Sequence, residues 1–139
     1  GPLPVDLIIA QAAVESGWGT SRFATEGNAL FGQWTWKKGA GIIPLEREDG
    51  ETHAVRSYPS LIESVWDYAY NLNTSNSYQK FREARAQSIR EGLPLDAISL
   101  MKNLKNYSQK GDAYIATLRE VIKQNNLTTL NQTKSEKPK

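Results

Sequence analysis

The sequence predicts an α+β domain that is mostly helical and carries a small β-hairpin lobe. Apolar residues recur at helical spacing over most of the chain, and the dipeptide Asp49-Gly50 is typical of a tight hairpin turn. The 139 residues are enough to bury one hydrophobic core, so a single domain is expected. We expect a cleft where the helical body meets the lobe.

The composition excludes several classes of site. There is no cysteine and only one histidine, His53, so neither a thiolate nor a histidine-based metal site is expected, and no cofactor is predicted. The net charge of +2 and the scattered basic residues argue against nucleic acid as a partner. No apolar run reaches the roughly 18–20 residues of a membrane span.

Helices are predicted where apolar residues recur every three or four positions between capping signals. The motif Ser60-Leu-Ile-Glu63 is a capping box, and Ile62 on that helix and Ile98 further on are expected to face the core. The predicted helical ranges are residues 4–15, 22–28 (short or irregular), 60 to between 71 and 76, 77–90, 95–104 and 112–124.

The β lobe is predicted within residues 31–58. Strands over residues 42–48 and 51–58 would flank the Asp49-Gly50 turn, with His53 at the surface or an edge. The domain is expected to span residues 1–126, and residues 127–139 have no periodicity and are predicted to form a disordered tail. The opening Gly1-Pro2 is typical of tag cleavage, so an excised domain is expected.

Glu15 is out of pattern for a helix-end acid. It shares a helix face with Ala12 and Ile8, three and seven residues earlier, whereas exposed acids normally occupy the polar face. A carboxyl in an apolar setting stays protonated to higher pH, which a general acid requires. The alternative is a glutamate that packs against its own turn or pairs with Arg22.

Several segments resemble one family. The run Ala10-Gln-Ala-Ala-Val-Glu-Ser-Gly-Trp-Gly-Thr-Ser21, followed by Asn28-Ala-Leu-Phe-Gly32, resembles the signature of bacterial peptidoglycan glucosaminidases, glycoside hydrolase family 73. The segments most similar to the Bax-like bacterial branch are Phe31-Gly-Gln-Trp34, Gly39-Ala-Gly-Ile-Ile-Pro44 and Tyr70-Asn-Leu-Asn-Thr74. Tyr107-Ser-Gln-Lys-Gly-Asp-Ala-Tyr114 resembles the family's C-terminal tyrosine motif, and the resemblance covers about residues 3–125.

This resemblance implies a lysozyme-like fold in which the β lobe flanks the active-site cleft. It also implies hydrolysis of the β-1,4 bond between N-acetylglucosamine and N-acetylmuramic acid. The expected partner is the peptidoglycan glycan strand, in the periplasm or outside the cell, and a monomer is expected. The family domain usually carries another helix before this start, and Bax-like chains commonly have cysteines where this chain has Thr35 and Ala40.

The resemblance also assigns catalytic roles. Glu15 matches the general acid, which protonates the leaving oxygen. The second carboxylate is Glu46, which fits the broader family, or Glu48, where Bax-like chains more often carry an acid; on an alternating strand the two share a face. A third possibility is neither, with the substrate's acetamido group as nucleophile. Tyr107 matches a tyrosine near the catalytic centre, unless it only packs between helices.

Substrate contacts are expected at the lip of the cleft. Trp34 and Trp36 suit sugar stacking but could equally form a core for the lobe. The other expected substrate-binding residues are Gln33, Phe31 and Asn71, although capping also explains Asn71. Two other functions use the same features: a muramidase or lytic transglycosylase that acts through Glu15, and a non-catalytic glycan-binding module.

Overall fold

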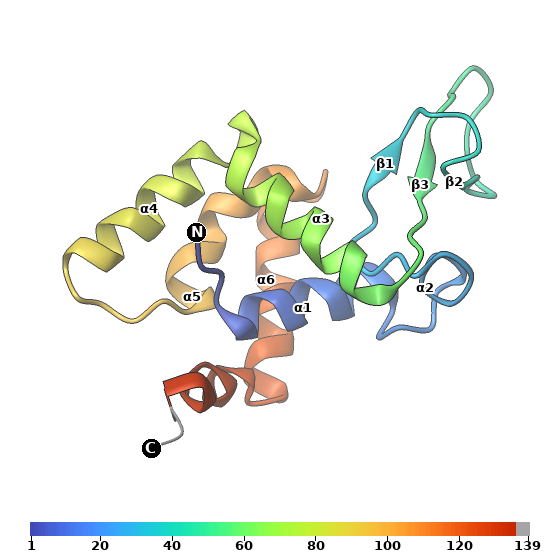
Figure 1. The fold of residues 1–139 in the computed structure, drawn as a ribbon. Coiled ribbons are helices and arrows are strands. Elements are labelled where there is room, and N and C mark those ends of the chain that lie inside the picture. The colour runs from blue at the N-terminus through green and yellow to red at the C-terminus, as the bar shows by residue number, and fades with distance from the viewer. Residues whose placement is uncertain (136–139) are drawn as a thin grey trace. The chain divides into compact units, whose positions relative to one another are not determined.

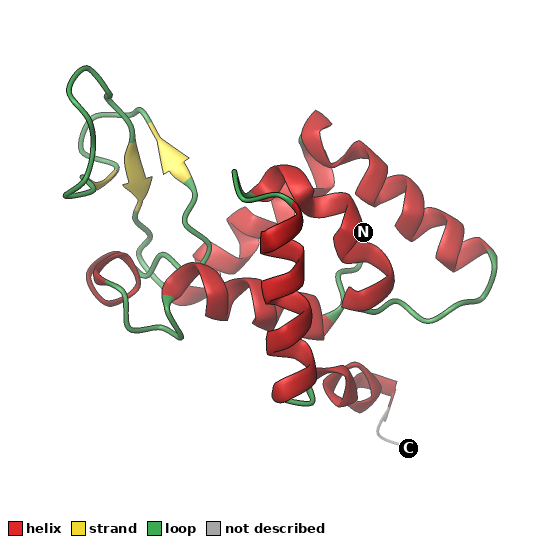
Figure 2. Ribbon diagram, turned by 180° about the vertical axis from the view of Figure 1, so that it is seen from behind, coloured by secondary structure: helices red, strands yellow, loops and turns green. Residues whose placement is uncertain are grey.

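The computed structural model describes residues 1–135, with side chains described up to residue 131. It is mostly helical with one small antiparallel sheet, which confirms the predicted fold class (Figures 1 and 2). The chain forms two compact units, one of Gly1–Gln11 with the chain from Tyr70 onward and one of Ala12–Ala69. Two helices, α1 (Val5–Ser16) and α3 (Leu61–Thr74), each contribute to both units.

Every regular element described in the first unit is a helix. Beyond the start of α1 and the end of α3, these are η1 (Asn76–Tyr78), α4 (Gln79–Arg90), α5 (Ala97–Leu100), η2 (Met101–Tyr107), α6 (Asp112–Gln124) and η3 (Leu127–Ser135). Because α6 packs against both η2 and η3, their apolar faces share one core. Its fully buried side chains include Leu7, Leu72, Phe81, Leu100, Met101, Leu104 and Leu118.

Asp6 joins three segments of this unit. Its buried carboxylate accepts hydrogen bonds from the backbone N–H groups of Leu7 (2.9 Å) and Ala97 (3.1 Å), the first residue of α5. The Asp6 backbone N–H donates to Oδ1 of Asn131 in η3 at 3.1 Å. Burial raises the pKa of the Asp6 carboxyl above its ordinary value, although these hydrogen bonds oppose the shift.

The predicted disordered tail is the main departure in this unit. From residue 127 the chain forms η3 instead, because Leu127 is buried and Asn131 accepts the Asp6 hydrogen bond. Neither contact leaves a periodic pattern in the sequence. Residues 136–139 of the predicted tail lie outside the described residues.

The second unit holds the sheet. After the end of α1 come α2 (Arg22–Gly27), β1 (Trp34–Thr35), β2 (Gly41–Ile42), β3 (Ala54–Arg56) and the start of α3. The strand order is β1-β3-β2, and Val55 of β3 lies opposite both Trp34 and Ile42.

The predicted long hairpin strands are wrong. Asp49-Gly50 does form a turn, since the Glu51 N–H donates to the Glu48 carbonyl at 3.1 Å. This turn lies inside an irregular segment, residues 43–53, and closes no ladder. The β2 strand pairs with β3 across that whole segment, so a local turn signal did not fix the strand register.

The capping pair at the start of α3 forms as predicted, with the Glu63 N–H 3.4 Å from Ser60 Oγ. The buried face of α3 differs from the prediction: it carries Ser64, Tyr68 and Leu72, while Ile62 is 52% exposed. Ile98 on α5, also expected inward, is 40% exposed. In both helices the inward face is the one that carries the largest buried side chains, and the isoleucine lies outside that face.

Candidate active site

The end of α1 positions Glu15. Glu15 is the penultimate residue of the helix and is half-buried. The next residue, Ser16, is buried, and its hydroxyl donates to the Ala12 carbonyl (2.6 Å) and accepts from the Gly19 N–H (2.9 Å). The Trp18 N–H donates to the Ala13 carbonyl at 2.8 Å. These bonds use donors and acceptors that a helix end leaves unsatisfied, so they hold the helix end that carries Glu15.

Trp18 has a left-handed backbone, with φ of 58° between two glycines that also have positive φ. A bulky residue is strained in that region and persists there only when its surroundings hold it. The Trp18 side chain is 60% exposed. The hydrogen-bonded turn therefore presents an indole to solvent three residues after Glu15.

Gly32 brings the chain against the Glu15 carboxylate. Its φ is +67°, and a Cβ atom added at Gly32 would lie 3.3 Å from Glu15 Oε2. The neighbouring Phe31 is only 3% exposed and stacks on Tyr68 of α3, with ring centroids 4.0 Å apart. Phe31 was expected to contact substrate, but it is a core residue that anchors the Gly32 backbone beside Glu15.

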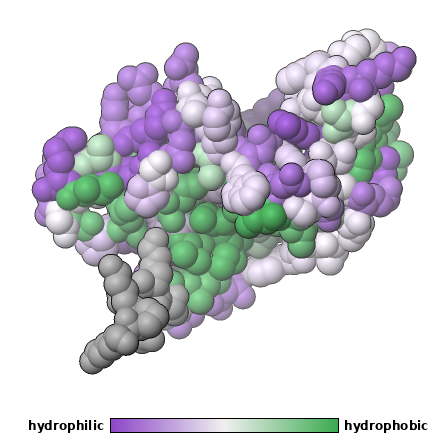
Figure 3. All heavy atoms as spheres, in the orientation of Figure 1, coloured by the Kyte–Doolittle hydropathy of each residue, from purple (hydrophilic) through white to green (hydrophobic). Residues whose placement is uncertain are grey.

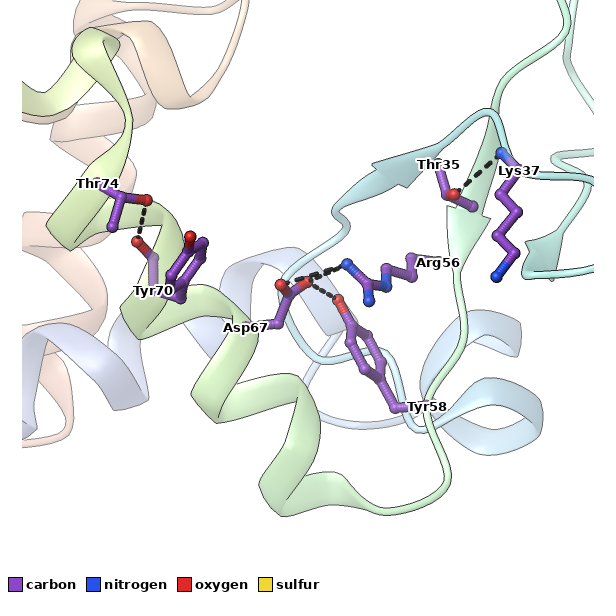
Figure 4. Close-up of polar contacts among 7 residues, drawn as sticks. All are labelled: Thr35, Lys37, Arg56, Tyr58, Asp67, Tyr70 and Thr74. Atoms are coloured by element: carbon purple, nitrogen blue, oxygen red, sulfur yellow. Dashed lines mark hydrogen bonds and ion pairs between the residues drawn. The ribbon is translucent and has the colours of Figure 1, made fainter.

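Gln33 is held by α3. Its side-chain amide donates to Asp67 Oδ2 (3.2 Å) and accepts from the Tyr68 N–H (3.0 Å), in the orientation that satisfies both partners. Asp67 also pairs with Arg56 of β3 at 3.4 Å and accepts from the Tyr58 hydroxyl (Figure 4). These contacts tie the sheet and its neighbouring segments to α3 and fix the Gln33 side chain.

Sequence reasoning did not find this cluster around Asp67. Burial and the hydrogen bond to Asp67 raise the pKa of Tyr58 well above its ordinary value, so the phenol stays protonated and keeps donating. The available signal was the segment Arg56-Ser-Tyr-Pro-Ser60, which carries two of the three partners. Its side chains could be paired with Asp67 only once α3 was placed.

The lobe tryptophans are packed on one side and exposed on the other, so both roles that the sequence left open remain possible for them. Trp34 stacks on His53 with ring centroids 3.7 Å apart, and Trp36 meets Trp34 edge-on at 6.1 Å. His53 is only 7% exposed, so its predicted surface position is wrong: Trp34 covers it. Trp34 and Trp36 nevertheless remain 50% and 66% exposed, which leaves aromatic surface available to a ligand.

Glu46 and Glu48 lie in the irregular segment of residues 43–53, and both are exposed. Since neither is on a strand, the expectation that they share a strand face is wrong. The segment is fastened by Arg47, whose guanidinium donates to the His53 carbonyl at 2.9 Å, and by the Glu48 N–H, which donates to Glu51 Oε1 at 2.9 Å.

Tyr107 and Asn71 belong to the first unit. Tyr107 is half-buried at the end of η2, and its ring lies 6.0 Å from the rings of both Tyr78 and Tyr114. Both neighbours are buried, and the Tyr114 hydroxyl accepts from the Gln11 amide at 2.9 Å, so Tyr114 is a core residue. Asn71 is half-buried in α3, and its backbone carbonyl accepts from the Ser75 N–H.

The described residues contain neither a metal-binding cluster nor a membrane-spanning helix. No group of three or more histidine, cysteine or acidic side chains there could hold a metal ion. Among the helices of that part of the chain, none combines the length and apolarity needed to cross a bilayer.

Comparison with known proteins agrees with the sequence resemblance. A glucosaminidase family model, described as mannosyl-glycoprotein endo-β-N-acetylglucosaminidase, matches residues 2–127. The protein bax of Escherichia coli (strain K12) is 37% identical over 112 residues, which are 81% of this chain and 39% of bax. The chain thus spans about two fifths of the length of that relative.

A solved structure supports the same conclusion. The catalytic domain of the autolysin Auto from Listeria monocytogenes matches with a TM-score of 0.65 and 26% identity, over 89% of this chain and 73% of that one. This likeness agrees with the lysozyme-like fold that the sequence resemblance implied, and the identity to bax agrees with the Bax-like branch. The chain belongs to the glucosaminidase family of glycoside hydrolases.

Proposed function

We propose that this chain hydrolyses the β-1,4 bond between N-acetylglucosamine and N-acetylmuramic acid in peptidoglycan, with Glu15 as the general acid. The observation that carries the proposal is the close approach of Gly32 to Glu15 Oε2 in a chain of the glucosaminidase family. A glycine with positive φ at this point keeps a side chain away from the carboxylate, as access for a glycosidic oxygen requires. Proton transfer to that oxygen avoids an alkoxide leaving group.

The second catalytic group is proposed to be Glu46 or Glu48, or else the substrate's acetamido group. Both acids are exposed on one fastened segment, which suits an ionised carboxylate that stabilises positive charge or activates water. A separation from Glu15 of ~5 Å would favour a covalent intermediate, and ~6.5–9.5 Å would leave room for water.

Other side chains are proposed to hold the substrate. The exposed surfaces of Trp34 and Trp36 offer flat aromatic area for sugar rings, and Gln33 has an amide oriented by Asp67. Tyr107, held by two buried tyrosines, could hydrogen-bond the acetamido group or the attacking water. Asn71 is proposed as a further polar contact. Because peptidoglycan is the substrate, we place this activity in the periplasm or outside the cell.

The test compares Glu15→Gln with Glu26→Gln, a control glutamate whose side chain is 62% exposed. Both proteins are incubated with purified sacculi, and the released fragments are identified by mass spectrometry after reduction. We expect wild-type protein and the control to release fragments with reducing N-acetylglucosamine ends, and Glu15→Gln to release none while its thermal midpoint stays within a few degrees.

Each alternative gives a different result. Reducing muramic ends would indicate a muramidase, and anhydro-muramic ends a lytic transglycosylase. Sacculus binding by the wild-type protein without any released fragment would indicate a glycan-binding module. Full activity in Glu15→Gln would remove the general-acid assignment.

A further inference from the structure

A pocket with two cationic side chains lies in the second unit, the unit that also holds Glu15. It encloses about 530 Å³, within the range of small-molecule sites. The end of β1, the turn that follows it, the end of β3 and the segment before α3 form its walls. The lining includes Thr35, Lys37, Arg56 and Tyr58.

The pocket has one positive charge in excess. Lys37 forms no ion pair with the residues that the structure describes, whereas Arg56 pairs with Asp67 at 3.4 Å. Among the described residues that line the pocket there is no carboxylate. The acids of residues 31–58 all lie in the segment of residues 43–53, whose hydrophilic surface forms the tip of the lobe in Figure 3. An unbalanced cation at a concave surface raises the local concentration of anions.

The hydrogen-bonding groups of the lining indicate which kind of anion fits. Thr35 Oγ1 accepts from the Lys37 N–H at 3.2 Å, which leaves its hydroxyl hydrogen to donate (Figure 4). The Lys37 ammonium has donors only, and Arg56 uses Nη1 for Asp67 and keeps its other N–H groups for a ligand. A carboxylate has only acceptors and a single charge, so it matches these donors and the excess charge. A phosphate dianion would bring a second negative charge towards Asp67.

Contacts within the second unit connect this pocket to Glu15. Gln33 Nε2 and Arg56 Nη1 contact the same oxygen, Asp67 Oδ2, at 3.2 and 3.4 Å. The Arg56 N–H also donates to the Gln33 carbonyl at 2.8 Å. Gln33 directly follows Gly32, where an added Cβ atom would lie 3.3 Å from Glu15 Oε2. The pocket therefore lies beside the Gln33 amide, on the strand that continues from the backbone next to the proposed general acid.

The two sugars of peptidoglycan differ at O3, where N-acetylmuramic acid carries a lactyl group. That group ends in a carboxylate when no peptide is attached, and an attached peptide carries carboxylates of its own. We propose that the pocket of Lys37 and Arg56 binds a carboxylate of this O3 substituent and makes the enzyme prefer peptidoglycan glycan to chitin, which has the same β-1,4 bond and no such group. The ligand assignment rests on the proposed function. Both side chains bind substrate and take no part in bond cleavage.

The test measures binding without turnover. Glu15→Gln protein is titrated calorimetrically with three oligosaccharides of equal length: a chitin oligosaccharide, peptidoglycan glycan stripped of peptide by an amidase, and peptide-bearing glycan. Adding Lys37→Glu is expected to weaken binding of an anionic oligosaccharide roughly tenfold, because an exposed attraction is replaced by a repulsion of similar size. Binding of the neutral chitin oligosaccharide should not change. Weakening for the stripped glycan identifies the lactyl carboxylate as the ligand, and weakening for the peptide-bearing glycan alone identifies a carboxylate of the peptide.

The control is Lys38→Glu, which makes the same change of charge at the next residue, an exposed lysine that does not line the pocket. It should bind all three oligosaccharides as the parent does. Equal weakening by the two variants, or no weakening by Lys37→Glu, would overturn the proposal. So would equal affinity of the parent for the three oligosaccharides, or an equal loss of chitin binding in Lys37→Glu, because the pocket would then not recognise a carboxylate.

The outcome is independent of the cleavage assay. If wild-type protein releases no fragment from sacculi but Lys37→Glu selectively loses anionic glycan, the proposed function fails and the carboxylate site stands. If cleavage occurs and Lys37→Glu keeps the parent's preference for anionic glycan, only this inference fails.

Discussion

Glu15 Oε2 lies 3.3 Å from the point where residue 32 would carry a Cβ atom, and residue 32 is glycine. The same glycine has φ of +67°, a conformation that costs other residues roughly 1–2 kcal/mol. Gly32 thus meets two requirements at once: it permits the backbone conformation, and it leaves the Glu15 carboxylate accessible.

Gly32→Ala should therefore lose both stability and activity. We expect about 1–2 kcal/mol less free energy of unfolding from the backbone strain and at least a tenfold lower kcat, because the methyl group displaces the Glu15 carboxylate. Gly92→Ala is the matched control, with φ of +68° and no heavy atom within 4 Å of the added Cβ. It should lose similar stability and keep its kcat. Unfolding in urea and release of fragments from sacculi measure the two effects.

The two lobe tryptophans should respond differently to truncation. Trp34→Ala uncovers His53 and is expected to cost about 2 kcal/mol of stability through lost apolar burial. Trp36→Ala removes a mostly exposed ring and should change stability by less than about 0.5 kcal/mol. It should instead raise KM roughly fivefold, since ring stacking contributes about 1 kcal/mol. An unchanged KM in Trp36→Ala would remove this residue from the substrate site.

Glu46→Gln and Glu48→Gln should separate the candidates for the second catalytic group. Both side chains are exposed, so neither change should alter the thermal midpoint. If one residue supplies the catalytic carboxylate, its variant should lose about 100-fold or more in kcat while the other stays near wild type. Equal and mild losses in both variants would favour nucleophilic assistance by the acetamido group. Asp49→Asn, an exposed acid on the same segment, is the control.

Asp6 should impose a pH dependence on stability. Because its pKa is raised in the folded state, the folded protein binds the Asp6 proton more tightly than the unfolded chain does. The resulting stabilisation is complete below the ordinary aspartate pKa of about 4 and is lost as pH rises through the raised value. Asp6→Asn should remove this contribution, so the difference in unfolding free energy between variant and wild type should change with pH above about 4.

Urea unfolding between about pH 4 and pH 7 measures this effect. Asp112→Asn is the control, because that carboxylate is 85% exposed. A pH-independent difference between Asp6→Asn and wild type would contradict the prediction.

The sequence predicted the helices better than it predicted the lobe, and the general-acid role of Glu15 stays a prediction. Helix signals are local: the Ser60–Glu63 capping pair and the apolar repeat of residues 112–124 depend on near neighbours. Strand register is not local, because Val55 of the central strand pairs with residues of both neighbouring strands. The segment that connects β2 to β3 is residues 43–53. The buried positions of His53 and Phe31 also depended on distant partners, Trp34 and Tyr68.

All four tryptophans of the chain lie within Ala12–Ala69, and each side chain is at least half exposed. The indoles that emit therefore all belong to the second unit. Even in the native protein, their emission maximum should lie at a longer wavelength than that of buried indoles. A change in emission on adding glycan would register events near Trp18, Trp34, Trp36 or Trp66. Unfolding of the helical first unit has to be followed through its tyrosines, by near-ultraviolet circular dichroism, because indole fluorescence does not sample it.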